Sequence, residues 1–161
     1  MDNQNTVGTQ FKALTVIHAA LCFGLLVMLG IMRYLVKQNG APPENNIAFE
    51  VAGVAIAFIN VLSARFLFFV RTKPALSVAS LTEKLNIFRA AYIVQMALLE
   101  GAGIVNIIFY LLTKNDLHFF IALGVLLLMV FRRPTRVMAA MVIFNSNEDL
   151  QQVYDDNLPL D

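Results

Sequence analysis

Long apolar stretches alternate with short polar ones along the chain. Four of these stretches predict helices at residues 12–36, 46–70, 83–113 and 117–131. The first three are long enough to cross a bilayer, which takes about 20 helical residues. The fourth has only 15 uninterrupted apolar residues, or about 22 Å at ~1.5 Å per residue, so it spans only if its flanking arginines reach the interface or the helix continues.

Breaker residues separate the four predicted helices. Gly40, Pro42 and Pro43 end the first helix, Pro74 follows the second within a polar loop, and a polar turn lies at 114–116. Gly and Pro are the strongest local breaks in a helical pattern. The connections are therefore short, and the pattern predicts an all-α, polytopic membrane four-helix bundle.

The segment after the fourth predicted helix is first apolar and then acidic. Residues 135–144 are apolar and follow Pro134, and proline favours the first turn of a helix. We expect a kinked, interfacial extension there, then a solvated acidic segment with a short helix at 147–154. The predicted domains are a four-transmembrane-helix domain with this extension at 1–144 and an acidic cytoplasmic tail at 145–161.

Composition supports a membrane protein and excludes several other classes. Hydrophobic residues make up 58% of the chain and charged residues 14%, against roughly 25% charged in soluble domains. Too little charge remains to build a water-exposed surface, which argues against both a soluble domain and a disordered chain. The net charge of +1 gives no basic excess for nucleic acid, whose phosphates need several Lys or Arg contacts.

The distribution of lysine and arginine predicts the orientation. Nine of the twelve lie near the N-terminus, around the second loop or after the fourth helix, while Arg33, Lys37 and Lys114 lie on the opposite side. Positive residues concentrate in cytoplasmic loops. We therefore expect a multi-pass protein of a bacterial inner membrane with both termini in the cytoplasm.

No sequence signature of an enzyme is present. The single cysteine, Cys22, lies within an apolar run, so a disulfide framework and a cysteine metal site are excluded. The chain has no Gly-rich phosphate loop and no His-Glu-x-x-His motif, and its loops are too short for a catalytic site. We expect no enzymatic activity, cofactor or metal.

The first and third helices resemble each other at an offset of 77 residues. Residues 16–21 align with 93–98, and Gly24 aligns with Gly101, while the second and fourth helices align more weakly. Two repeated helical hairpins explain this pattern, and so does chance, because apolar helices match one another easily.

Glu100 is the main candidate for a functional residue. It is the only charge between Arg89 and Lys114, about 16 and 21 Å from them by helical rise, and so near the bilayer centre. A carboxylate at that depth is costly and faces the bundle interior with a partner or a role. It is either a proton, cation or ligand site or a hydrogen-bonded structural group, and Asn60 is the polar side chain most nearly level with it.

Other polar residues favour packing roles. Small residues at Gly53, Ala57 and Ala64, with Asn60 between them, share one face of the second helix, and such faces pack tightly in membranes. One face of the third helix carries polar, aromatic and small residues, namely Tyr92, Gln95, Leu99, Gly103, Asn106 and Tyr110. We expect Gln95 and Asn106 to hydrogen-bond across helices.

The two histidines lie at different depths. His18 lies on an apolar helix and is either a hydrogen-bonded packing residue or a proton relay, and His118 lies at a turn, where we expect it to be interfacial. The candidate ion or ligand site therefore comprises Glu100, Asn60, Gln95 and His18.

The region around the third helix resembles the proteolipid c subunits of rotary ATPases. The resemblance rests on residues 97–101, Ala-Leu-Leu-Glu-Gly, after a cytoplasmic loop at 71–74, and covers about residues 47–112. It implies that Glu100 binds a transported ion in a duplicated four-helix chain. The sequence departs from that family in two ways. The family has a glycine-rich inner helix, whereas the second helix here has one glycine, Gly53. Duplicated members are expected to carry the carboxylate on the last helix, whereas here it lies on the third. The chain is also similar to uncharacterised bacterial four-helix membrane proteins, which implies a shape and no activity.

Three hypotheses about function follow. The first is a structural or accessory integral membrane protein that packs with itself, as a homo-oligomer, or with a larger membrane complex. The second is a proton- or cation-translocating element centred on Glu100. The third is a lipid or small-molecule binder that uses the polar face of the third helix.

Overall fold

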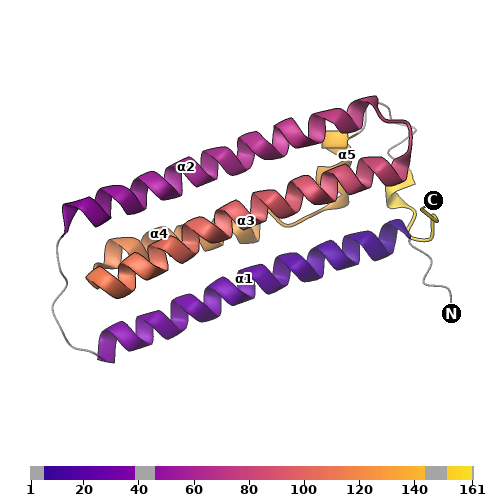
Figure 1. Cartoon of the computed structure of the whole chain (residues 1–161). Coiled ribbons are helices and arrows are strands. Elements are labelled where there is room, and N and C mark those ends of the chain that lie inside the picture. The colour runs from indigo at the N-terminus through magenta and orange to yellow at the C-terminus, as the bar shows by residue number, and fades with distance from the viewer. Residues whose placement is uncertain (1–5, 39–45, 144–151, 161) are drawn as a thin grey trace. The chain divides into compact units, whose positions relative to one another are not determined.

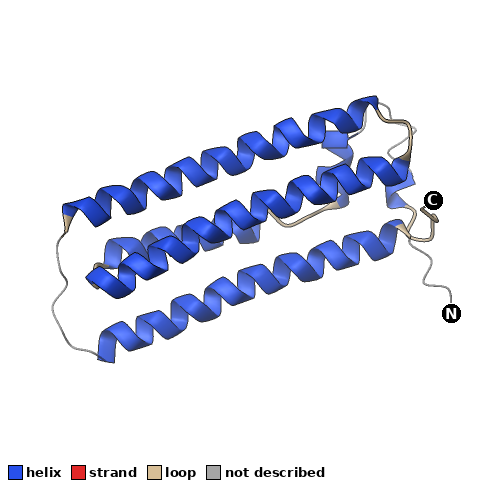
Figure 2. Cartoon of the chain, viewed as in Figure 1, coloured by secondary structure: helices blue, strands red, loops and turns tan. Residues whose placement is uncertain are grey.

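The computed structural model describes residues 6–38, 46–143 and 152–160. Its elements are α1 (Val7–Gln38), α2 (Ile47–Thr72), the 3₁₀ helix η1 (Lys73–Ser77), α3 (Leu81–Thr113), α4 (Asp116–Phe131) and α5 (Arg136–Ile143), labelled in Figure 1. Figure 2 shows helices and loops only. Within the described residues the sole β-type pairing is an isolated bridge between Thr6 and Pro159. The predicted all-α fold class is confirmed at this level.

The helix boundaries follow the sequence pattern closely, with two differences. α1 begins at Val7, five residues before the predicted start, and the predicted polar loop after α2 contains η1. The predicted 135–144 extension is helical as α5, although its last residue lies outside the described residues. The domain boundary at 144/145 and most of the predicted 147–154 helix also lie outside them, and only residues 152–154 of that helix are seen as helical.

The tight turn between α3 and α4 relies on the backbone of one residue and the side chain of the next. Lys114 adopts a positive φ of 56°, and its N–H donates to the Tyr110 carbonyl at 2.8 Å, as at many helix C-termini. Asn115 then caps α4, because its side chain accepts a hydrogen bond from the Leu117 N–H at 2.9 Å. The turn therefore reverses the chain within three residues.

Three helices are long and apolar enough to cross a membrane, namely α1, α2 together with η1, and α3. A fourth span exists only if α4 and α5 count together, and the chain bends by 80° at the break between them. Thr135 caps α5, since its Oγ1 accepts from the Met138 N–H at 3.1 Å. This bend agrees with the predicted kink after Pro134.

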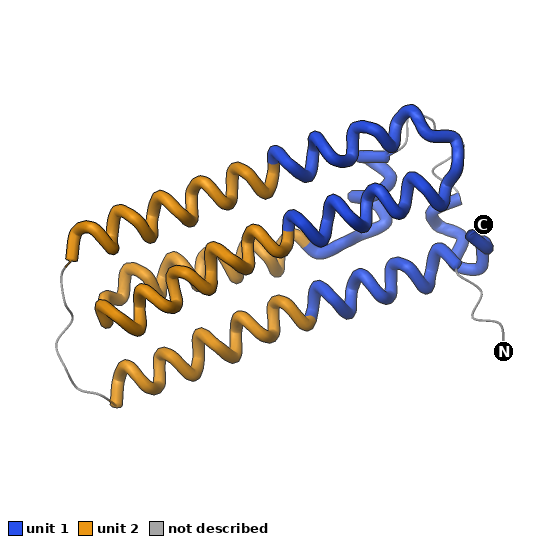
Figure 3. The backbone as a smooth tube through the Cα atoms, viewed as in Figure 1, with its two compact units in different colours: residues 1–19, 66–95, 133–161 blue, residues 20–65, 96–132 orange. Residues whose placement is uncertain are grey.

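The chain divides into two compact units, which Figure 3 shows in different colours. Unit 1 contains residues 1–19, 66–95 and 133–161, and unit 2 contains residues 20–65 and 96–132. The three long helices each contribute to both units, so each unit is described by its own contacts below.

An aromatic cluster forms the core of unit 1. Phe88 of α3 is buried and lies with its ring centroid 6.4 Å from Phe11, 5.9 Å from Phe68 and 6.2 Å from Tyr92. Edge and offset contacts at these distances add to the stability gained by burying the rings. The cluster therefore ties the first turns of α1 and α3 to the end of α2.

The C-terminal segment belongs to unit 1, where it pairs with the start of α1, and it is only partly solvated. Its carboxylates at Asp155 and Asp156 are exposed as expected, but Val153 is fully buried. Backbone hydrogen bonds join Val7 to Leu158 and Gly8 to Asp156, each at 3.3 Å. Most of residues 152–160 are exposed, as expected of a solvated tail, but the burial of Val153 and the backbone pairing with the start of α1 keep them attached to unit 1.

Unit 2 packs around the C-terminal half of α3. The side chain of Leu25 from α1 covers Gly103 so closely that a Cβ at residue 103 would lie 2.7 Å from it. Phe49 of α2 lies edge-on to Phe109 of α3 at 5.1 Å. The small-residue face of α2 is turned inward, as predicted, with Ala57 and Ala64 buried.

Candidate functional site: buried polar groups in each unit

The main buried polar site of unit 2 is centred on Asn106 of α3. Asn106 and His118 are both fully buried. The Asn106 Nδ2 donates to the Gly53 carbonyl of α2 at 3.2 Å and to the Ala102 carbonyl at 3.0 Å. Its Oδ1 lies 3.2 Å from His118 Nδ1 of α4. One amide therefore links three helices, and we call this set the Asn106 network.

The hydrogen bonds of Asn106 fix the tautomer of His118. Both Nδ2 hydrogens go to backbone carbonyls, so Oδ1 must accept and His118 Nδ1 must carry the proton. The other ring nitrogen, Nε2, is then a bare acceptor, and it is buried without a hydrogen-bond partner among the described residues. The imidazole ring also lies edge-on to Phe109 at 5.5 Å.

Gly53 makes room for this network. A Cβ at residue 53 would lie 2.6 Å from His118 Nδ1 and 2.8 Å from Asn106 Oδ1. No side chain fits there without moving the ring or the amide. The expectation that His118 is interfacial missed this burial: His118 is in the first turn of α4, but its ring occupies the space that Gly53 leaves.

A second set of polar contacts surrounds the turn between α3 and α4. Arg33 of α1 forms an ion pair with Asp116, donates to Tyr110 Oη at 2.7 Å and lies 4.5 Å from the Phe119 ring centroid. Asn115, in the turn itself, donates a hydrogen bond from its Nδ2 to Glu50 Oε1 of α2 at 2.9 Å. These contacts join the ends of the helices in unit 2 through charge-assisted bonds.

Glu100 and Asn60 both belong to unit 2, but no hydrogen bond joins them. Asn60 donates to the Ile56 carbonyl of its own helix at 2.9 Å. Glu100 is half-buried, and its carboxylate is close enough to Cys22 of α1 to act on it electrostatically. Within the described residues Glu100 makes no hydrogen bond or ion pair. The expected position of its side chain, close to α2 at the level of Asn60, stays a prediction.

His18 and Gln95 belong to unit 1. The Tyr92 Oη lies 2.7 Å from His18 Nδ1, with both side chains buried, so His18 has the cross-helix bond of a packing residue. Gln95 is buried as well, but its Oε1 has no hydrogen-bond partner among the described residues. The expected cross-helix bond is thus present for Asn106 and absent for this oxygen of Gln95.

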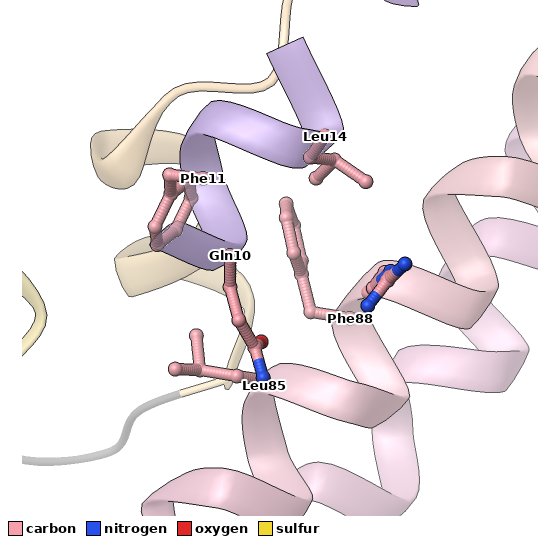
Figure 4. Close-up of a pocket in the computed structure, with 6 residues that line it drawn as sticks. Gln10, Phe11, Leu14, Leu85 and Phe88 are labelled. Atoms are coloured by element: carbon pink, nitrogen blue, oxygen red, sulfur yellow. The ribbon is translucent and has the colours of Figure 1, made fainter. Parts of the chain in front are cut away.

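A narrow pocket in unit 1 is too small for a ligand. Figure 4 shows Gln10, Phe11 and Leu14 of α1 facing Leu85 and Phe88 of α3, with the Gln10 side chain reaching toward Leu85. Its cavity volume is about 10 Å³, and a single water needs about 10–15 Å³. It is a packing defect at most.

Gly53 and His118 take part in the Asn106 network, which the sequence pattern did not predict. Gly53 was assigned to packing and His118 to the interface, although a glycine on an inward face opposite a polar residue of α3 was a usable signal. Among the described residues no group of three or more His, Cys, Asp or Glu side chains gathers in a way that could hold a metal ion.

No protein-family model, no curated protein and no solved structure matches the chain.

Proposed function

We propose that this chain is a multi-pass protein of a bacterial inner membrane that crosses the bilayer four times, with both termini in the cytoplasm. The pairing of Thr6 with Pro159 supports an even number of crossings, because residues before α1 and near the chain end share one side. With three clear spans, α4 must then return the chain. The nine-to-three asymmetry of Lys and Arg supports the cytoplasmic assignment.

The spans form a four-helix bundle of two repeated hairpins. The contact register between α1 and α3 supports the repeat: Phe11 contacts Phe88 in unit 1, and Arg33 bonds Tyr110 in unit 2. Each pair is separated by 77 residues, the offset at which the two helices align in sequence. Parallel helices from a duplicated hairpin would meet at this register.

The role that fits best is structural or accessory, through packing with further copies or with a larger membrane complex. The observation that carries this proposal is the open face of α1 in unit 2. Gly24 has no atom within 4 Å of the position its Cβ would occupy, and Ala20, one turn earlier, is also exposed. Small residues four apart let a second helix approach closely in lipid, where packing drives association.

Self-association measured by energy transfer in liposomes tests this role. Gly24→Leu should reduce it strongly, since a bulky side chain blocks close approach while the chain's own packing has room for it. Gly124→Leu on α4 is the matched control, because Gly124 is equally open but lies on another helix. A wild-type chain that stays monomeric in liposomes, or two variants with identical effects, would defeat the proposal.

Proton or cation translocation is the second candidate, and the environment of Glu100 favours it. A half-buried carboxylate without a hydrogen bond to a described residue can bind and release a proton or cation. Proton flux into proteoliposomes, followed with a pH-sensitive dye, tests it. Glu100→Gln should abolish the flux, because an amide cannot release a proton, and Glu50→Gln should keep it. Flux that survives Glu100→Gln would exclude Glu100 as the carrier.

The third hypothesis, a ligand on the polar face of α3, receives less support. That face is buried by packing against other helices within each unit, as the exposures of its members indicate for Tyr92, Gln95, Leu99, Asn106 and Tyr110. A ligand there would have to displace side chains that already contact one another.

A further inference from the structure

A cleft in unit 1 opens between the first turns of α1 and the residues that lead into α5. Its volume is about 710 Å³. The polar side chains that line it come from three segments: Lys12 and Thr15 on α1, Arg133, Thr135 and Arg136 around the start of α5, and Asp156 near the chain end. The cleft lies near the start of α1 and before α5, where charged residues flank the apolar stretches of the chain.

The cleft carries unbalanced positive charge. Of its three cations only Arg136 is neutralised: it pairs with Asp156 and donates to the Tyr154 carbonyl at 3.0 Å. Lys12 and Arg133 are exposed and form no ion pair with a described residue. Asp156 is the only acidic group in the lining. Two cations from different segments of the lining are therefore available to an anion.

The uncharged lining suits an amphiphilic anion. The Thr135 Oγ1 accepts a hydrogen bond from the Met138 N–H, so its own hydrogen can still be donated. Phe11 and Val16 add apolar surface on the α1 side. A hydroxyl, two cations and an apolar wall match a phosphate attached to a hydrocarbon body.

We propose that this cleft binds the phosphate headgroup of an anionic phospholipid, with Lys12 and Arg133 contacting the phosphate and Thr135 donating a hydrogen bond. Basic pockets at the ends of membrane helices bind such headgroups. Free inorganic phosphate shares the charge but has nothing to place against Phe11 and Val16. The site does not depend on self-association through α1, so the two proposals fail independently.

Native mass spectrometry of the purified full chain with phosphatidylglycerol or phosphatidylcholine tests the site. Each cation near an anionic lipid is worth about a 5-fold change in affinity. Lys12→Gln combined with Arg133→Gln should therefore weaken phosphatidylglycerol binding about 25-fold. The control, Arg71→Gln with Lys73→Gln, removes two exposed cations of unit 1 that lie outside the cleft and should leave the affinity unchanged.

Conservative variants separate charge from folding. Lys12→Arg and Arg133→Lys should keep binding within about 3-fold, and the single Gln variants carry the test if the double variant does not fold. Equal affinity for the two lipids, or an equal loss in the Arg71 and Lys73 control, would overturn the proposal. Inorganic phosphate that displaced phosphatidylglycerol at equal concentration would overturn the lipid assignment.

Discussion

The Asn106 network of unit 2 and the cationic cleft of unit 1 use polar side chains in opposite ways. In the network, neutral groups are buried and nearly every hydrogen bond is made within the chain. In the cleft, Lys12 and Arg133 are exposed and form no ion pair with a described residue. The first arrangement consumes its polar groups in packing, whereas the second leaves them available.

This difference separates stability from binding. In lipid, a buried amide or imidazole needs a partner inside the protein, so a complete network holds helices together. A charged group at the membrane surface has water and headgroups as partners, so it contributes little to folding. Variants in the network should therefore change stability, and variants in the cleft should change binding.

The largest effect is expected at Gly53. Gly53→Ala forces a Cβ to within 2.6 Å of the His118 ring, and overpacking of this kind costs about 3 kcal/mol at the upper end of its range. Thermal unfolding in detergent should show a clear loss of stability. Gly30→Ala is the control, because that site is open and alanine favours a helix. Equal stability of the two variants would mean that the His118 ring is not held against α2.

The next effect is expected at Asn106. Asn106→Leu keeps the size of the side chain but leaves the proton of His118 Nδ1 buried without its acceptor, at a cost of about 2 kcal/mol. The double variant Asn106→Leu with His118→Phe should recover part of the loss, because the phenylalanine ring has no buried N–H that lacks an acceptor. Additive losses measured by the same unfolding assay would argue that the two residues do not interact.

Much of the fold could be predicted from the sequence because apolar length and breakers decide where membrane helices begin and end. The starts of α2, α3 and α4 follow this local signal. The start of α1 does not, because its first two residues, Val7 and Gly8, pair through their backbones with the chain end, a contact that no local pattern encodes.

The candidate site was less predictable because partners depend on how helices are rotated. Depth along a helix puts Glu100 level with Asn60, and both belong to unit 2, but rotation directs the Asn60 amide to its own backbone. The His118 side chain is buried because its ring fits into the space that Gly53 leaves. The residue type alone indicates that a buried polar group needs a hydrogen-bond partner, but it does not identify that partner.

A smaller effect is expected at the docked C-terminal segment. Val153→Ala removes buried methyl groups, each worth about 0.8 kcal/mol, so residues 152–160 should detach more often and be cleaved faster by added protease. Tyr154→Ala, at an exposed neighbour, should leave the cleavage rate unchanged. Identical rates for the wild type and both variants would show that Val153 does not anchor the segment.

The smallest effect on stability is expected in the cleft. Lys12→Gln with Arg133→Gln should leave the unfolding midpoint in neutral detergent unchanged, because neither side chain has an ion-pair partner among the described residues. The same double variant should lose the stabilisation that phosphatidylglycerol gives the wild type, since a ligand that binds only the folded state raises its stability. A lower midpoint in neutral detergent would mean that the cleft belongs to the packing, as the Asn106 network does.

The proposed four-crossing topology underlies both halves of this comparison, and cysteine labelling tests it most directly. In a Cys22→Ser background, Gln38→Cys, Ser77→Cys and Gln152→Cys introduce single thiols at exposed positions. A membrane-impermeant maleimide should label Gln38→Cys only from outside the cell, and the other two only from the cytoplasmic side of inverted vesicles. Labelling of Gln152→Cys from the same side as Gln38→Cys would mean that α4 does not return the chain, and would contradict the account.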